Sequence, residues 1–409
     1  MAALTGLSQG FLSMLESGAR RLTSLDKVER FLLGIGAPEG LLPPPIRKHC
    51  ALRTQQPLPA TGPEPTFDKD ADLQALAAQA AAQSIQFAEK TLRSNVTDES
   101  LEVLTHSIGT IATDYVHTPL HPLFKKLLVT RNQIFELLGG RQRPHQTREL
   151  HLLAGTSCLL LAHASQNLGD ADAAMAQIRT AWEFAEQADH NDLRAWTKGT
   201  AALISEWSPQ HQSSLEYTRE AAALSPQGET RVRIAAIEAR AAARIGDRGT
   251  ALAALGDLRR AREQQDSTES LNRFGGILTF PGAKQEYYIG GTYALLGEHG
   301  LAEHHATRAI AMYENGPKRE RSYGDEALAR LDVVTSRIAT GELEGASEQF
   351  LPLLDLPQNL RIQQIGHAVR QVADLLGAPR LARSRTAREL VEAARSYQAI
   401  DTPLKAALS

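Results

Sequence analysis

The sequence has few of the residues that support cross-links, sheets or membrane spans. It has two cysteines, Cys50 and Cys158, which cannot form a disulfide framework and have no zinc-type spacing with histidine, so a reducing, cytoplasmic location is expected. Aromatic residues make up 5% of the chain, which points away from sheets towards close-packed helices. No apolar run reaches the roughly eighteen residues of a membrane span, and the N-terminus lacks the pattern of an export signal. We therefore expect neither a membrane partner nor secretion.

Motifs of the common enzyme classes are also missing. The chain contains no phosphate-binding glycine loop, no His-Glu-x-x-His and no Gly-x-Ser-x-Gly. His299, His304 and His305 lie close together, but adjacent histidines point to different faces of a helix, so we expect a solvated helix face there. The sequence thus predicts no enzyme, no metal and no cofactor. A formal net charge of −3 gives no general affinity for nucleic acid, and any such role must be local.

Helical periodicity dominates the second half of the chain. Between Leu152 and Trp196, apolar positions follow two helical faces that are separated by a break at Gly169-Asp170, which predicts a helical hairpin. Similar turn signals recur about 36 to 51 residues apart, as expected of a two-helix repeat. We therefore predict an all-α fold. The recurring turns are Ser208-Pro209, Gly246-Asp247, Gly297-Glu298, Gly341-Glu342 and Gly377-Ala378.

Three further segments precede these repeats. Residues 39–66 are rich in proline and have no periodic apolar face, which is typical of a partly extended linker. Residues 67–148 carry three helical patterns and form a connector region, and they end in the basic run Arg141 to Arg148, interpreted as a solvated loop. Residues 1–38 are a head in which Gly6 separates two short helical patterns, and Ser8 is placed to cap the second.

The head resembles the second half of an XRE (Cro-type) DNA-binding domain. The resemblance rests on the turn glycine Gly6, the apolar positions Leu12 and Leu15, and the ending Glu16-Ser17-Gly18. It implies a helix-turn-helix in which Gln9 reads adenine in the major groove, while arginines supply attraction to phosphates that is blind to sequence. The DNA-binding residues that it implies are Ser8, Gln9, Gly10, Ser13, Met14, Ser17, Arg20 and Arg21.

The match to this family starts inside its second helix. Three explanations follow: the reading frame is annotated from a late start codon, the chain has lost DNA binding, or a partner completes the head. The alternative role of Arg20 and Arg21 is that of a solvated turn. Double-stranded DNA is therefore an expected partner only where the head is complete.

Residues 149–400 resemble tetratricopeptide repeats. Small residues such as Ala174, Ala181, Ala302 and Ala309 fall where that family packs its helices closely, so the resemblance implies an α-solenoid. In that geometry the first helix of each unit lines a concave groove, and the basic and aromatic residues there suit an acidic or aromatic peptide or a carboxylate. The candidate groove residues are His163, Trp196, Arg233, Arg240, Lys284 and Tyr287. Their alternative roles are core aromatics and solvated charges.

The order of the segments is similar to that of actinobacterial XRE-type regulators with a tetratricopeptide-like C-terminal domain. Strings such as Leu193-Arg194-Ala195-Trp196 and Glu320-Arg321-Ser322-Tyr323 carry this likeness. It implies a sequence-specific transcriptional regulator whose helical-repeat body senses a peptide, small-molecule or protein ligand and forms a homo-oligomer. The alternative is a tetratricopeptide-type protein-interaction scaffold that has lost DNA binding.

Overall fold

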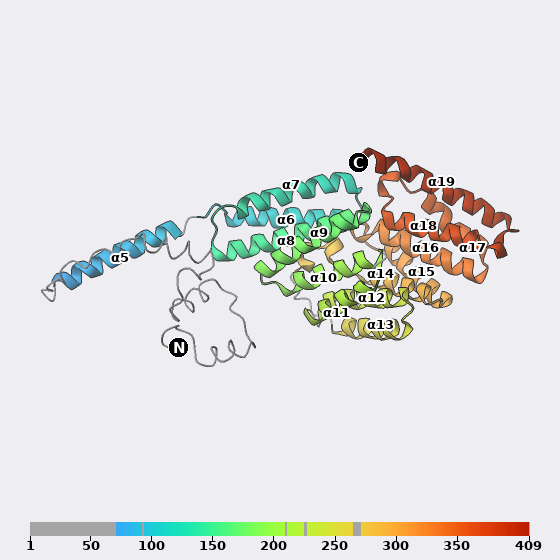
Figure 1. The fold of residues 1–409 in the computed structure, drawn as a ribbon, viewed down its shortest axis with the longest axis horizontal. Coiled ribbons are helices and arrows are strands. Elements are labelled where there is room, and N and C mark those ends of the chain that lie inside the picture. Colours follow the sequence, from blue (N-terminus) through green and yellow to red (C-terminus); the bar gives the residue numbers. More distant parts are fainter. Residues whose placement is uncertain (1–70, 92–93, 209–210, 225–226, 265–270, 409) are drawn as a thin grey trace, which may run out of the picture. The chain divides into compact units, whose positions relative to one another are not determined.

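The computed structural model describes residues 71–91, 94–208, 211–224, 227–264 and 271–408. This part of the chain contains fifteen α-helices, short 3-10 turns and no β-strand, which confirms the all-α prediction for it (Figure 1). None of the helices described is long and apolar enough to cross a membrane. The head, the linker and all the predicted DNA-binding residues, from Ser8 to Arg21, lie outside the described residues.

Two compact units divide the chain, residues 1–87 and 88–409, and each is considered by itself. Most of α5 (Ala71–Thr91) belongs to the first unit. This alanine-rich helix exposes three large apolar side chains, Leu76, Ile85 and Phe87. The second unit begins its helical body with α6 (Asp98–Asp114) and α7 (Leu120–Leu138). These three helices lie where the periodicity predicts the helices of the connector region.

Consecutive helices of the second unit then pack as hairpins, which is consistent with a helical repeat. The predicted turns lie between the two helices of each hairpin. Gly169, Gly246, Gly297 and Gly341 have φ between 75° and 89°, a left-handed conformation that glycine adopts without steric cost. The hairpins are α8 (Pro144–Asn167) with α9 (Ala171–Gln187), α10 (Asn191–Glu206) with α11 (His211–Leu224), α12 (Gly228–Arg244) with α13 (Arg248–Glu263), α14 (Gly282–Leu295) with α15 (His299–Asn315), α16 (Tyr323–Thr340) with α17 (Leu343–Leu354), and α18 (Gln363–Leu376) with α19 (Arg385–Leu408).

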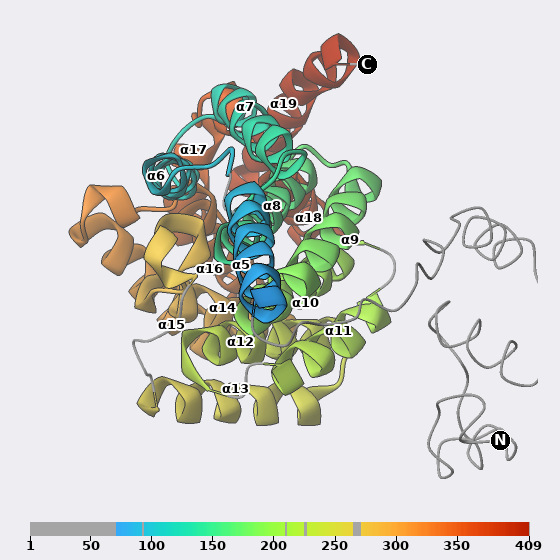
Figure 2. The ribbon, with the colours of Figure 1, turned by 90° about the vertical axis from the view of Figure 1, so that its left-hand side faces the viewer.

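The first helices of the six hairpins surround a common centre. Each of α8, α10, α12, α14 and α16 contacts the next first helix, and α18 returns to contact α8. We call these six helices the inner ring; the second helices α9, α11, α13 and α15 follow one another outside it (Figure 2). The first helix of this ring is buried along most of its length. In α8 every residue from Leu152 to Gln166 is buried.

Small residues allow this close packing. A Cβ atom on Gly155 would lie 2.6 Å from Leu193 Cδ2, and one on Gly290 would lie 3.0 Å from the Ala306 nitrogen. The ring closes where the start of α18 meets the end of α8, and a small residue lies there too. A Cβ atom on Gly169, just after α8, would lie 3.3 Å from the side chain of Gln363 in α18. The inner ring therefore depends on glycine at its tightest contacts.

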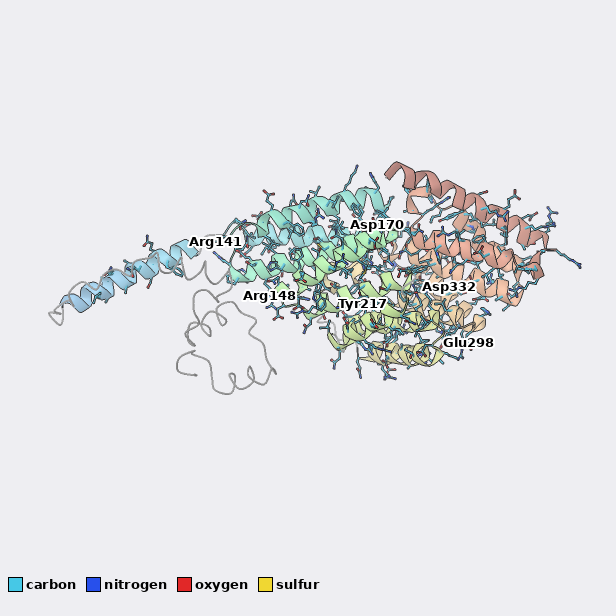
Figure 3. The ribbon with its side chains drawn as sticks, viewed as in Figure 1. Arg141, Arg148, Asp170, Tyr217, Glu298 and Asp332 are labelled. Atoms are coloured by element: carbon cyan, nitrogen blue, oxygen red, sulfur yellow. The ribbon has the colours of Figure 1, made fainter. Side chains whose placement is uncertain are left out.

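The basic run Arg141 to Arg148 is not a simple solvated loop, because α8 already begins at Pro144. Arg148 donates from Nε to the Ala188 carbonyl at 2.7 Å and from Nη2 to the Asp189 carbonyl at 3.1 Å. These carbonyls follow the last turn of α9, where backbone acceptors have no helical donor. Arg148 therefore ties the start of the inner ring to the end of an outer helix (Figure 3).

Candidate functional site

A cavity lies at the centre of the inner ring. It has a volume of about 90 Å³, and residues of all six inner helices line it, together with the end of α6 and Ile277 of the 3-10 turn Gly276–Leu278. In α8 the lining residues lie near the C-terminus, from His163 to Asn167, and in α18 the lining residue Gln364 lies near the N-terminus. We call this space the central cavity. A molecule inside it would touch every repeat.

Five of the six predicted groove residues line the central cavity: His163, Arg233, Arg240, Lys284 and Tyr287. They are buried in the ring rather than spread along an open groove, since His163, Arg233, Arg240 and Tyr287 are at most 6% exposed. Trp196 is buried as well and lies next to the lining, where its ring faces the Arg233 guanidinium at 4.2 Å. The structure thus brings these residues together around one cavity in the ring.

Arg240 is held in the interior by a carboxylate and by aromatic rings. Its Nε and Nη2 donate to the two carboxylate oxygens of Glu206 at 2.9 and 3.0 Å, and its Nη1 donates to the Tyr287 hydroxyl at 2.8 Å. The Tyr288 ring lies 4.5 Å from the guanidinium carbon. Burial opposes the charge of Arg240, but Glu206 outweighs burial and raises its pKa well above the ordinary value.

Glu206 is completely buried and also accepts a hydrogen bond from Arg244 Nη2 at 3.0 Å. Burial alone would raise the pKa of its carboxyl. The charges of Arg240 and Arg244 outweigh burial, so the pKa of Glu206 is lowered and the group stays ionised. One carboxylate thus serves two arginines.

Arg233 differs from Arg240 because no carboxylate neutralises it. Among the described residues, none forms an ion pair with its guanidinium, although only 3% of the residue is exposed. Its Nη2 donates to the Thr200 hydroxyl at 2.9 Å, and its Nη1 lies 3.5 Å from the Trp196 carbonyl oxygen. Burial lowers the pKa of Arg233 to about 10, so the group is still a cation at neutral pH.

No family model and no curated protein matches the sequence. The chemistry of the central cavity is therefore the main indication of a function in the described part of the chain.

His163 extends the polar lining without adding charge. Its Nε2 lies 3.2 Å from the Thr200 hydroxyl, which also receives the hydrogen bond from Arg233. Burial first, and then the positive charges of Arg233 and Lys284, lower the pKa of His163 well below its ordinary value. The imidazole is therefore neutral at neutral pH and offers one donor and one acceptor.

Lys284 lies at the boundary between the central cavity and a larger groove. Its Nζ is 3.5 Å from an Asp325 carboxylate oxygen, which Tyr313 also approaches with its hydroxyl at 3.4 Å. The larger groove has a volume of about 650 Å³ and lies between α6, the segment 272–281 and the residues before α16; we call it the outer groove. Both spaces share Val116, Lys284, Ser322 and Asp325 in their linings.

Several charged residues form structural contacts instead of a site. Glu326 accepts from Arg321 Nε at 2.6 Å and from Arg330 Nη2 at 3.0 Å, so it forms ion pairs at the start of α16. The expectation of a solvated histidine face is wrong for His305, because its Nδ1 lies 2.7 Å from the buried Glu286 carboxylate. In the described part of the chain, no group of His, Cys, Asp or Glu side chains is arranged to hold a metal ion.

Sequence reasoning missed the residues that complete the cavity from distant helices. Glu206 had no local signal that would mark it as the partner of Arg240, which lies 34 residues later. Gln364, at the start of α18, also lines the cavity; it is 8% exposed, and its Oε1 has no hydrogen-bond partner. A buried arginine such as Arg240 needs a carboxylate nearby to neutralise its charge. Which residue supplies that carboxylate depends on the packing of α10 against α12.

Proposed function

We propose that this protein is a sequence-specific DNA-binding transcriptional regulator whose helical-repeat body binds a small ligand. The observation that carries the sensing part is the central cavity: all six inner helices line it, and it contains the buried cation Arg233, which has no counter-ion in the described part of the chain. A buried charge without a partner is costly unless something neutralises it, so it favours a site for an anion over a structural core. The DNA-binding part rests on the resemblance of the head.

In this proposal the closed ring of inner helices couples ligand binding in the central cavity to the DNA-binding head. A ligand that contacts every inner helix changes the free energy of any arrangement in which the helices move relative to one another, since it binds one arrangement better than the others. The body self-associates in this proposal. Two heads must then match half-sites about one helical turn apart on the duplex, and ligand-dependent spacing of the heads changes the affinity for DNA.

One surface favours the alternative of a protein-interaction scaffold. An open groove of about 440 Å³ lies on α9, α10 and α11, and its lining includes Trp182, Lys198 and Tyr217. Lys198 Nζ lies 4.5 Å from the Trp182 ring and 5.5 Å from the Tyr217 ring (Figure 3 labels Tyr217). Aromatic residues around a cation are typical of peptide-binding surfaces. The central cavity favours the sensor over the scaffold, because buried charged residues line it.

Selection of duplexes from a random pool tests the proposed function. We expect the chain, or a version of it extended upstream to complete the head, to enrich one sequence, with affinity that falls steeply with salt. Gln9→Ala is expected to relax the preferred sequence, whereas Arg20→Ala with Arg21→Ala weakens binding to all duplexes. Lys125→Ala, on an exposed position of α7, is the matched control. Failure of both versions to enrich any duplex would contradict DNA binding and favour the scaffold.

A further inference from the structure

We propose that the central cavity binds a small carboxylic acid that also carries a hydrogen-bond donor, of the 2-hydroxy or 2-amino acid class, with its carboxylate on Arg233. The inference deepens the proposed sensing function and rests on it for its biological role. It depends on three observations: the charge of the cavity, the geometry of Arg233, and the amide oxygen of Gln364 in α18, which has no hydrogen-bond partner among the described residues.

The charges around the cavity do not balance. Lys284 is paired with Asp325. Arg240 and Arg244 share Glu206, and they also interact with Asp332, whose pKa burial raises to about 7. His163 is neutral, so it does not change the sum. Arg233 remains as a positive charge that contacts no acidic side chain among the residues that the structure describes. Because the side chains around Arg233 are buried, an anion bound there would be stabilised more than at the protein surface.

The guanidinium of Arg233 is fixed and only partly used. One face stacks on the Trp196 ring at 4.2 Å, and Trp196 is itself fixed by its indole N–H, which donates to the Thr230 hydroxyl at 3.0 Å. Thr200 takes one N–H of Nη2 at 2.9 Å, and the Trp196 carbonyl takes one N–H of Nη1 in a long contact of 3.5 Å. A guanidinium has five N–H groups, so donors remain for a carboxylate, whose two oxygens match the spacing of the fork.

Gln364 supplies the second recognition element. Its side chain lines the same cavity from the first turn of α18, and its buried Oε1 accepts no hydrogen bond. A buried acceptor with no donor costs free energy, and a hydroxyl or ammonium group on the ligand would remove that cost. A simple carboxylate satisfies Arg233 alone. A hydroxy or amino acid satisfies both residues.

Two further features agree with a small anion. The N-terminal residues Gly324 of α16 and Gln364 of α18 both line the cavity, and helix N-termini carry partial positive charge. The volume of about 90 Å³ is well below the roughly 300 Å³ of the smallest pockets for drug-sized ligands, so a peptide does not fit. The outer groove, which shares Lys284 and Asp325 with the cavity, is the route by which a small acid would enter.

Titration calorimetry of the full chain with named probes tests the inference. The probes are acetate, L-lactate, L-alanine and the neutral analogue lactamide. We expect L-lactate or L-alanine to bind more tightly than acetate, and lactamide not to bind. Arg233→Met should weaken binding by at least about tenfold, since a charge-assisted hydrogen bond is lost. Arg233→Lys should keep part of the affinity, because it retains the charge but not the fork.

Gln364→Met separates the two recognition elements. It should remove the advantage of L-lactate over acetate and leave the affinity for acetate unchanged, because only the donor contact is lost. Arg259→Met, at an exposed position of α13, is the matched control and should change neither affinity. A thermal melt of each variant without ligand shows whether it is folded, and Arg233→Met is expected to melt no lower than the wild type.

Three results would overturn the inference: no probe binds the wild type, lactamide binds as well as lactate, or folded Arg233→Met binds as the wild type does. These results are distinguishable from failure of the proposed function. A chain that binds the acid but no duplex contradicts transcriptional regulation only. A chain that enriches a duplex but binds none of the acids contradicts this inference only.

Discussion

Glu206→Gln removes the charge that balances two arginines inside the inner ring. The carboxylate is completely buried and accepts from Arg240 Nε at 2.9 Å, Arg240 Nη2 at 3.0 Å and Arg244 Nη2 at 3.0 Å. Glutamine keeps the shape but turns an N–H₂ group towards one of these donors, and it leaves Arg240 as a buried cation. Removing one partner of a buried pair costs about 3–5 kcal/mol of unfolding free energy. We expect a loss in that range.

Urea unfolding followed by tryptophan fluorescence measures this loss. Trp207 reports on the site directly, because its ring lies 5.5 Å from the Arg240 guanidinium carbon and 5.1 Å from that of Arg244. Glu298→Gln is the matched control: Glu298 accepts from Arg248 at 2.6 Å, but both side chains are more than two-fifths exposed. Exposed pairs contribute about 0–1 kcal/mol, so the control should change little.

A double variant tests the cause of the loss. Glu206→Met combined with Arg240→Met replaces the ion pair by apolar side chains of similar length, which is often neutral or stabilising for buried pairs. It should recover most of the stability lost in Glu206→Gln. The argument would be refuted if Glu206→Gln unfolds at the same urea concentration as Glu298→Gln, or if the double variant is less stable than the single one.

Two further predictions concern packing and pH. Gly155→Ala should cost about 1–3 kcal/mol of unfolding free energy, because its Cβ would lie 2.6 Å from Leu193 Cδ2. Gly300→Ala is the control: its Cβ would meet nothing within 4 Å, so the change should be neutral or stabilising. Equal melting temperatures for the two variants would contradict the close approach of α8 to α10. Burial raises the pKa of Asp332 from 3.8 to about 7, against the opposing charges of Arg240 and Arg244. Because the folded-state pKa lies above the unfolded value, the contribution of Asp332 to stability is greatest at low pH and is lost as pH rises through about 7. The wild type should therefore lose stability relative to Asp332→Asn between about pH 4 and 7. Parallel pH profiles of the two proteins in thermal melts would rule this out.

Local sequence signals predicted the hairpins well. Gly169, Gly246, Gly297 and Gly341 end helices in a conformation that other residues adopt only at a cost, so the sequence itself marks the turns. Arg233 and Arg240 are seven residues apart, which places them on one face of one helix and made them candidates for the same surface. The choice of inward-facing residues came from the tetratricopeptide geometry that the resemblance implies, in which the first helix of each repeat faces inward.

Closure of the ring could not be predicted in the same way. It depends on a small rotation from each hairpin to the next, which adds up over six hairpins and is set by contacts between hairpins, such as that of Gly155 in α8 with Leu193 in α10. The partnership of Arg240 with Glu206 and the position of Gln364 in the cavity follow from that rotation. His305 was assigned to a solvated face because its partner Glu286 lies on a neighbouring helix. The DNA-binding residues remain predictions from the resemblance.

The most direct test of the central claim is the position of an anion in a crystal of the full chain soaked in bromide. Bromide scatters anomalously and carries a single negative charge, so its sites are located independently of any assumed ligand. The account predicts an anomalous peak inside the inner ring, in contact with the guanidinium of Arg233, and its loss in Arg233→Met. Peaks only at exposed arginines such as Arg259, with none beside Arg233, would contradict the claim that the central cavity is built for an anion.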